Sequence, residues 1–143
     1  ATLQIGVGGI PNAVINALRN HKHLGLHTEA ITDGVLPLIE KGIIDNSLKK
    51  LLPGKSVGSL VLGSRHLYDY MDGNPDFVIR DVAWTNDPQN IRQNPRAMAI
   101  NSAIEVVPIP SEKLSSLVWV VSMISCMAQR SQRAVSALLR YRV

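Results

Sequence analysis

Cysteine is almost absent from this sequence. Cys126 is the single cysteine among 143 residues, so no disulfide can form within the chain. No charged leader with a small-residue cleavage site comes before Thr2. Together these two absences predict a reducing, cytoplasmic location. Because the chain begins at Ala1 rather than Met, we also expect it to be a piece of a longer protein.

Most of the chain has no excess of charge of either sign. Residues 1–106 carry ten Lys and Arg side chains and ten Asp and Glu side chains, whereas residues 107–143 carry five basic side chains and Glu112 alone. The formal net charge of +4 therefore comes entirely from the tail. A balanced body excludes a general basic surface, and its few aromatic residues are not set among basic ones as a base-stacking platform requires. We expect no nucleic-acid partner.

Sequence signatures of metal binding and of membrane spanning are also missing. His21 and His23 flank Lys22 in a polar stretch with no third ligand nearby, so both histidines are expected at the surface. The tail contains the apolar run LVWVVSMISCMA, residues 117–128, which is well short of the roughly 20 residues that span a bilayer. We therefore expect no metal site and no membrane partner.

The residues that are present suit one globular domain with a sizeable core, since 45% of them are hydrophobic and 18% are charged. Short β-rich runs alternate with helical patterns along the body. The expected strands are residues 2–5, 25–31, 56–64, 77–84 and 97–106, and the expected helices are residues 11–20, 33–44 and 65–72, the second capped by Asp33. This alternation predicts an α/β fold with a mainly parallel sheet flanked by helices, whose ligands sit beyond the carboxyl ends of the strands.

Gly8 and Glu29 both fall at the carboxyl ends of expected strands. An acid about 20 residues after a glycine loop is the arrangement that binds pyrophosphate and ribose, and Glu29 follows Gly8 by 21 residues. However, the loop reads GVGGIP, with Pro11 where the dinucleotide fingerprint has its third glycine. From the residues alone, a nicotinamide-binding Rossmann-type domain, a tight turn that only packs a helix against the sheet, and a solvated strand-end acid all stay open.

Four runs follow one another along the body: LQIGVGGIPNAV, LGLHTEAITDGV, PGKSVGSLVLGSRHLYDYMDGNP and NDPQNIRQNPRAMAINSAIEV. Together they resemble the second half of the acetyl-CoA hydrolase and CoA-transferase family, especially its 4-hydroxybutyrate CoA-transferases. The resemblance covers residues 1–106, about three quarters of the chain, which are therefore interpreted as a partial CoA-transferase C-terminal domain. Residues 107–143 continue with VPIPSEK and depart abruptly from the family pattern, so they are interpreted as a non-homologous tail.

The resemblance implies roles for particular residues. The acid of the family's H-[ST]-E motif is its covalent nucleophile, which on this sequence is Glu29. Backbone N–H groups of Gly8 and Gly9 are candidate donors to a tetrahedral oxyanion, because a glycine loop lets a substrate approach closely. Asn101 in the NSAIEV run is a candidate for shaping the CoA or acyl pocket, with a buried structural amide as the alternative.

The implied reaction moves CoA between an acyl-CoA, such as 4-hydroxybutyryl-CoA or butyryl-CoA, and a small carboxylic acid such as acetate. A glutamate attacks the acyl-CoA carbonyl, and a glutamyl-CoA thioester forms by way of an anhydride. Coenzyme A is then a substrate, and no tightly bound cofactor or metal is needed. A homo-oligomer is among the expected assemblies. The alternative to a catalytic role is a vestigial, non-enzymatic module.

We predict that residues 107–143 are an out-of-frame translation of the family's continuing sequence. In the shifted frame, each codon consists of the third base of one codon and the first two bases of the next. Trp119 and Val120 must then give Gly, and Met123 and Ile124 must give Asp. Both residues agree with a shifted frame that reads GGQHDFMYGA. Such a tail would not pack on the domain as an ordered element. Sequencing of the gene tests this: Ser122 should be encoded by AGT or AGC and Arg133 by AGA or AGG. A TCN codon at Ser122 or a CGN codon at Arg133 refutes the shift. An amphipathic surface helix is the other interpretation of the tail.

Overall fold

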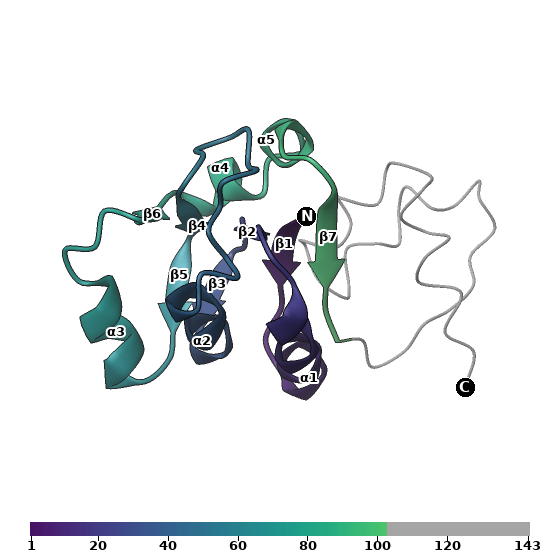
Figure 1. Cartoon of the computed structure of the whole chain (residues 1–143). Coiled ribbons are helices and arrows are strands. Elements are labelled where there is room, and N and C mark those ends of the chain that lie inside the picture. Colours follow the sequence, from purple (N-terminus) through teal and green to yellow (C-terminus); the bar gives the residue numbers. More distant parts are fainter. Residues whose placement is uncertain (103–143) are drawn as a thin grey trace.

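The computed structural model describes residues 1–102, which form short parallel strands and short helices (Figure 1). The strands are β1 (Thr2–Ile5), β2 (Gly25–Leu26), β3 (Ala30–Thr32), β4 (Ser56–Gly58), β5 (Leu60–Leu62), β6 (Phe77–Ile79) and β7 (Ala97–Ile100). The α-helices are α1 (Gly9–Ala17), α2 (Leu36–Glu40), α3 (Arg65–Met71), α4 (Val82–Thr85) and α5 (Pro88–Gln93), and the 3₁₀ turns are η1 (Leu18–Asn20) and η2 (Asp33–Val35). The tail 107–143, with its predicted frame shift and packing, lies outside the described residues.

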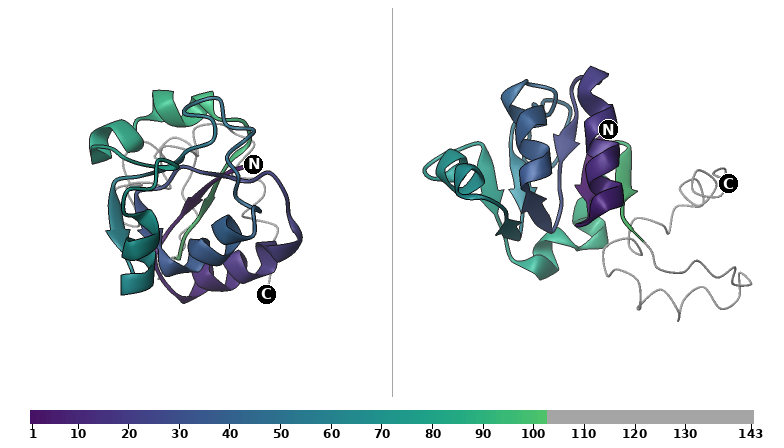
Figure 2. Two further views of the ribbon diagram at one scale, coloured as in Figure 1. Left: turned by 60° about the vertical axis from the view of Figure 1, so that its left-hand side comes forward. Right: turned by 90° about the horizontal axis from the view of Figure 1, so that it is seen from below.

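Every pair of strands in residues 1–102 is parallel. The sheets have the orders β2-β1-β7, β3-β5 and β4-β6, and an isolated parallel bridge joins His27 to Val57 beside β4. In the views of Figures 1 and 2, α1 and α2 lie next to each other on one side of the strands, and α4 and α5 lie on the other. The prediction of an α/β fold with a mainly parallel sheet flanked by helices is therefore confirmed.

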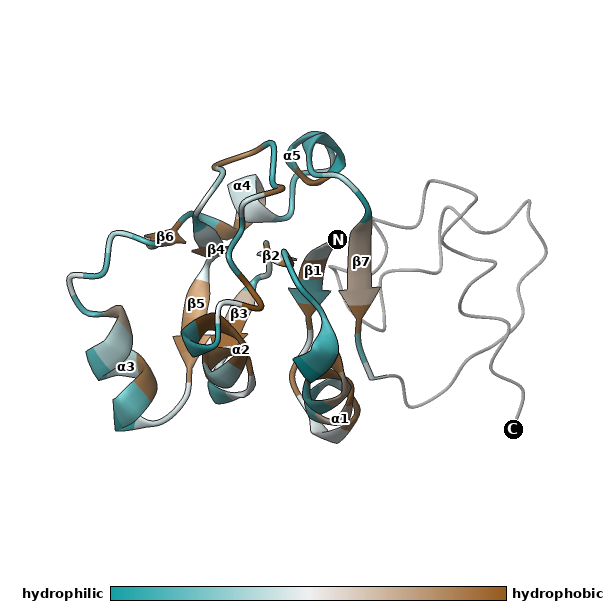
Figure 3. Ribbon diagram, viewed as in Figure 1, coloured by the Kyte–Doolittle hydropathy of each residue, from teal (hydrophilic) through white to brown (hydrophobic). Residues whose placement is uncertain are grey.

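The core forms where the inward faces of the strands meet α1 and α2. Leu3 and Ile5 of β1 are buried on one face of the strand, as the two-residue repeat of a strand requires. Figure 3 shows hydrophobic residues gathered on β3, β5 and α2. The buried cluster comprises Leu3, Ile5, Ile15, Leu24, Leu26, Ile31, Val35, Leu36, Leu38, Ile43, Ile44 and Leu67. Burying each of these side chains contributes about 1.5–3 kcal/mol, so this cluster is the main source of stability.

Two predicted strands are interrupted in the middle. The run 25–31 is divided into β2 and β3, with residues 27–29 between them, and the run 56–64 is divided into β4 and β5 at Ser59. The N–H groups of Ser59 and Leu60 both donate to the carbonyl of Glu29, at 2.8 and 3.0 Å. Two donors on one strand facing one carbonyl on the next is the arrangement of a β-bulge, which bends a strand and redirects its side chains.

The predicted strand at 77–84 is wrong in its second half. β6 stops at Ile79, and residues 82–85 form α4 because the Asp81 carboxylate accepts from the N–H of Ala83. The same type of cap, Asp87 accepting from the N–H of Gln89, begins α5, which the sequence analysis did not predict. At α4 the aspartate cap prevails over a β-rich composition, and at α5 it begins a helix in a polar run.

Asp33 does not cap the helix expected of it and instead binds the residue that precedes α3. Its two carboxylate oxygens accept from the backbone N–H of Ser64 at 2.8 and 3.0 Å, and Oδ1 also accepts from the Ser64 hydroxyl at 2.8 Å. Ser64 is the residue that precedes α3, so Asp33 fastens the start of α3 to the end of β3. The segment that Asp33 was expected to cap forms only η2 and α2, and it has no side-chain cap.

A buried lysine closes the gap where β2 and β4 diverge. Lys49 is 4% exposed, and its ammonium donates to the carbonyls of Leu26 at 2.8 Å and Lys55 at 2.6 Å. Asn46 accepts from the N–H of Leu26 at 2.8 Å and donates to the hydroxyl of Ser56 at 3.0 Å. The backbone N–H and the carbonyl of Leu26 are therefore both bound by side chains and not by the backbone of a neighbouring strand.

Burial lowers the pKa of Lys49 from 10.5 to about 8. The unfolded chain consequently binds more protons than the folded chain between about pH 8 and 10.5, so Lys49 makes folding more favourable as the pH rises through that range. As the pH rises through this range, we expect the free energy of unfolding of the wild type to increase by up to about 3 kcal/mol more than that of Lys49→Met, which has no titrating amine at this position. Urea unfolding of the 143-residue chain at pH 7.5 and pH 10 measures this difference. Lys50→Met, at an exposed neighbour, is the control, and its free energy of unfolding should change with pH as that of the wild type does. The same pH dependence in Lys49→Met and in the wild type contradicts a lowered pKa of Lys49.

Candidate active site

Glu29 lies between β2 and β3, and its backbone is fixed by the bulge described above. Its side chain is half-buried, and Oε2 accepts from Nδ2 of Asn86 at 2.8 Å. Within residues 1–102, Oε1 has no hydrogen-bond partner. One oxygen of the carboxylate is therefore oriented by an amide, and the other is left for a ligand.

Thr28 joins the residue before the carboxylate to the end of β1. Its side chain is 1% exposed, and Oγ1 donates to the carbonyl of Ile5 at 2.9 Å and accepts from the N–H of Ile5 at 3.1 Å. The N–H of Thr28 donates to the carbonyl of Val57 at 3.0 Å. Thr28 is thus bound to strands on both sides, which gives Glu29 a rigid support.

His27 joins the same segment to the chain that carries Asn86. Its ring is buried, and Nε2 lies 2.7 Å from the carbonyl of Thr85. Because a carbonyl only accepts, Nε2 carries the hydrogen. Burial lowers the pKa of His27, the bond to Thr85 acts against this, and the charge of Lys49 lowers the pKa further, so the ring is neutral at pH 7. Trp84 packs near the ring with a centroid distance of 6.0 Å.

Asn86 is the site residue that sequence analysis missed. It ends α4, one residue after Thr85, and it contacts Glu29 across 57 positions of sequence. In the sequence it belongs to the run NDP, which is typical of a turn before a helix. Nothing in that pattern indicates a contact with a distant acid.

The glycine loop occupies the carboxyl end of β1, as predicted. Gly8 has φ +130° and ψ −179°, a conformation that residues with a Cβ rarely adopt, and a Cβ there would lie 3.2 Å from the Ser102 hydroxyl. Gly9 begins α1, with no atom within 4 Å of where its Cβ would be. The loop follows Ile5, the residue that Thr28 binds, so the glycines and Glu29 share one edge of the sheet.

Asn101 forms contacts within the fold. Its Nδ2 donates to Oε1 of Gln4 at 2.8 Å, and its Oδ1 accepts from Nε2 of Gln4 at 3.3 Å. A Cβ on Gly6 would lie 2.3 Å from the Asn101 oxygen, so only glycine leaves room for this amide pair. These contacts are those of the structural alternative, and the pocket role of Asn101 stays a prediction.

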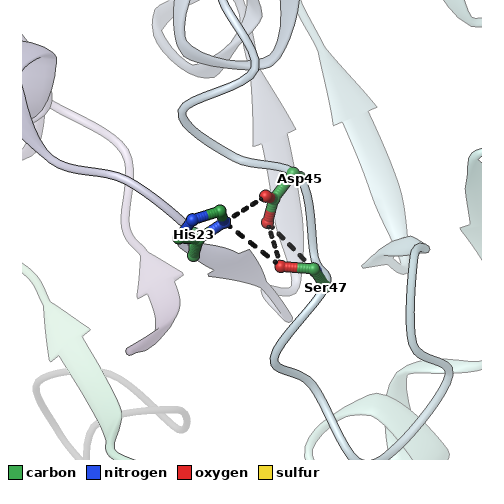
Figure 4. Close-up of polar contacts among 3 residues, drawn as sticks. All are labelled: His23, Asp45 and Ser47. Carbon is green, nitrogen blue, oxygen red and sulfur yellow. Dashed lines mark hydrogen bonds and ion pairs between the residues drawn. The ribbon is translucent and has the colours of Figure 1, made fainter.

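A histidine, an aspartate and a serine also meet on the surface (Figure 4). Nδ1 of His23 faces both Oδ2 of Asp45 at 2.6 Å and the hydroxyl of Ser47 at 3.4 Å, and that hydroxyl donates to Oδ1 of Asp45 at 2.8 Å. In a catalytic triad the serine and the acid use opposite nitrogens of the ring. This cluster therefore fastens a loop. His21 and His23 are exposed, as the sequence predicts.

Within residues 1–102, no group of three His, Cys, Asp or Glu side chains is placed to hold a metal ion. None of the described helices is both long enough and apolar enough to cross a bilayer.

Comparison with known proteins identifies the family. Residues 63–133 match the sequence model of the acetyl-CoA hydrolase/transferase C-terminal domain. The chain belongs to the acetyl-CoA hydrolase/CoA-transferase family. It is 54% identical over 106 residues to a succinyl-CoA:acetate/propanoyl-CoA:succinate CoA transferase of Fasciola hepatica, covering 74% of this chain and 22% of that protein. It is 43% identical over 106 residues to a 4-hydroxybutyrate coenzyme A transferase of Clostridium kluyveri, covering 74% and 25%.

Solved structures agree with the CoA-transferase family. A crystal structure of 4-hydroxybutyrate CoA-transferase from Porphyromonas gingivalis has a TM-score of 0.71 and 50% sequence identity, covering 73% of this chain and 27% of that one. RipA from Yersinia pestis has the same TM-score at 36% identity, covering 73% and 24%. The chain thus spans about a quarter of the length of the relatives it matches. The family match runs past residue 106 to residue 133, and the division at 106 stays a prediction.

We predict that the hydrogen bonds of the Thr28 hydroxyl stabilise the folded chain. Thr28→Val keeps the shape but removes both hydrogen bonds to Ile5, so the free energy of unfolding should fall by about 1–3 kcal/mol. Thr28→Ser keeps the hydroxyl and should lose less. Urea denaturation of the two variants measures the difference. Equal stability of Thr28→Val and Thr28→Ser shows that the hydroxyl contributes nothing.

Proposed function

We propose that Glu29 is the covalent nucleophile of an acyl-CoA:carboxylate CoA-transferase. The observation that carries the proposal is the state of its carboxylate: a rigid backbone, one oxygen held by Asn86, and the other without a partner in residues 1–102. A carboxylate held in this way is preorganised for attack in one direction. Family membership supports this chemistry over the dinucleotide alternative.

The reaction proceeds by exchange at two carbonyl carbons. The Glu29 carboxylate attacks the acyl-CoA carbonyl and the C–S bond breaks. CoA departs as a thiolate, and an acyl-glutamyl anhydride is formed on Glu29. The thiolate then attacks the glutamyl carbonyl, releasing the first carboxylate and leaving a glutamyl-CoA thioester. An incoming carboxylate attacks the thioester carbonyl and reverses these steps. Over the whole reaction one acyl-CoA thioester is consumed and another is formed, so coenzyme A is needed only as a substrate.

Asn86 and the glycine loop are suited to stabilise two different oxyanions in these reaction steps. Nδ2 of Asn86 already donates to the Glu29 carboxylate, so it is in place to stabilise the oxyanion that forms when thiolate attacks the glutamyl carbonyl. We assign the N–H groups of Gly8 and Gly9 to the oxyanion on the acyl-CoA carbonyl, because their loop lies at the same edge of the sheet. Losing one such donor typically costs about 3 kcal/mol in the transition state.

The names of the relatives guide the choice of substrates. We propose an acyl-CoA donor such as 4-hydroxybutyryl-CoA or butyryl-CoA and a small carboxylate acceptor such as acetate, since relatives are named for 4-hydroxybutyrate, butyryl-CoA and acetate. The single cysteine supports a cytoplasmic location. The residues that carry the chemistry come from this chain, and the remaining three quarters of the relatives' length is expected to complete the substrate site.

Glu29→Gln tests the nucleophile. In the longer parent protein it should lower acyl exchange by about 10³-fold or more while CoA binding is retained, because an amide keeps the size but is a poor nucleophile. Borohydride reduction during turnover should modify Glu29 alone, as mass spectrometry of peptides can show. Glu40→Gln, at an exposed acid, is the matched control.

One outcome would contradict the role of Glu29 as nucleophile, and another would contradict the inactivity expected of the isolated chain. Turnover retained in Glu29→Gln, measured free of deamidation, excludes a covalent role for this carboxylate. The 143-residue chain alone should exchange little or no CoA, because it spans about a quarter of its relatives. Efficient exchange by the purified chain contradicts that expectation.

A further inference from the structure

Two buried side chains that line one cavity each have a polar atom with no hydrogen-bond partner within residues 1–102. The atoms are Nδ1 of His27 and Nδ2 of Asn94, and each residue is 5% exposed. The hydroxyl of Ser59 is the third such atom in these residues, and Ser59 does not line that cavity. Buried polar atoms nearly always have a partner, so the two atoms at the cavity require an explanation.

Their chemical roles are complementary. His27 is neutral with its hydrogen on Nε2, which donates to Thr85, so Nδ1 carries a lone pair and accepts. The Oδ1 of Asn94 accepts from the backbone N–H of Leu51 at 3.1 Å, which fixes the orientation of the amide. Nδ2 of Asn94 is therefore a donor. One atom needs a donor and the other needs an acceptor.

Both side chains line the same cavity, which also borders Asn86 and the β1 residues Thr2 and Gln4. Its volume is about 20 Å³. A water molecule requires roughly 10–15 Å³ measured in this way. The cavity therefore accommodates one water.

We propose that this cavity holds one ordered water molecule, which donates to Nδ1 of His27 and accepts from Nδ2 of Asn94. Ordering a water costs at most about 2 kcal/mol, which is less than leaving two buried polar atoms unpaired. The water holds the His27 ring in the tautomer that donates to Thr85, the residue before Asn86. It is thus linked through two hydrogen bonds to the segment that orients Glu29. The proposal does not depend on the chemistry assigned to Glu29.

NMR spectroscopy of the 143-residue chain with ¹⁵N-labelled histidine tests the site. We expect His27 to be neutral with hydrogen on Nε2, with Nδ1 shifted as a hydrogen-bonded acceptor, and rotating-frame cross-peaks from a long-lived water to the His27 Hε1 and to the Asn94 side-chain amide. A hydrogen on Nδ1, a charged ring, or absence of those water cross-peaks overturns the proposal.

His27→Gln identifies the partner. The glutamine amide can donate to Thr85 as Nε2 does, but it places no acceptor at the position of Nδ1, so the water cross-peaks at Asn94 should be lost. His66→Gln, at an exposed histidine, should retain them. Persistence of the water at Asn94 in His27→Gln overturns the role of His27, and the wild-type spectra decide the matter if that variant does not fold. None of these signals depends on acyl exchange, so a failure of the Glu29 chemistry is distinguishable from a failure of the water site.

Discussion

His27 and Thr28 are buried and Glu29 is half-buried where residues 27–29 pass between strands, so the backbone polar groups of this segment need partners there. The N–H of His27 donates to Leu3 of β1, and the N–H of Thr28 donates to Val57 of β4. The carbonyl of Glu29 receives two donors from the start of β5. The three residues therefore act as a strand shared between neighbours, and the arrangement of β1, β4 and β5 follows from their hydrogen bonds.

The sequence indicates Glu29 through a short local motif, because HTE resembles the motif of the family's nucleophile. The alternation of elements along the chain indicates parallel pairing of the strands. Asn86 could not be located in this way, because its role depends on a contact across 57 positions and its own neighbours indicate only a turn. The same limit applies to the unpaired atoms of His27 and Asn94, which become visible only when burial is known.

The errors in the predicted elements share one cause. Composition favours a strand through residue 84, but Asp81 supplies a helix cap within that run, and one side-chain oxygen decides the local conformation. Asp33 shows the converse, since it was expected to cap its own helix and instead binds Ser64, 31 positions away. A cap motif indicates that a carboxylate will accept from backbone N–H groups, and the fold decides which ones.

The contribution of Glu29 to the fold comes through its main chain. Its carbonyl accepts from Ser59 and Leu60 whatever side chain it carries, and its carboxylate binds one amide at a half-buried position. The scaffold is therefore nearly indifferent to which residue stands there. A single codon change at this position would then remove the chemistry proposed for Glu29 and leave a folded protein. Gene duplicates with this architecture can thus drift into ligand-binding proteins without passing through an unfolded ancestor.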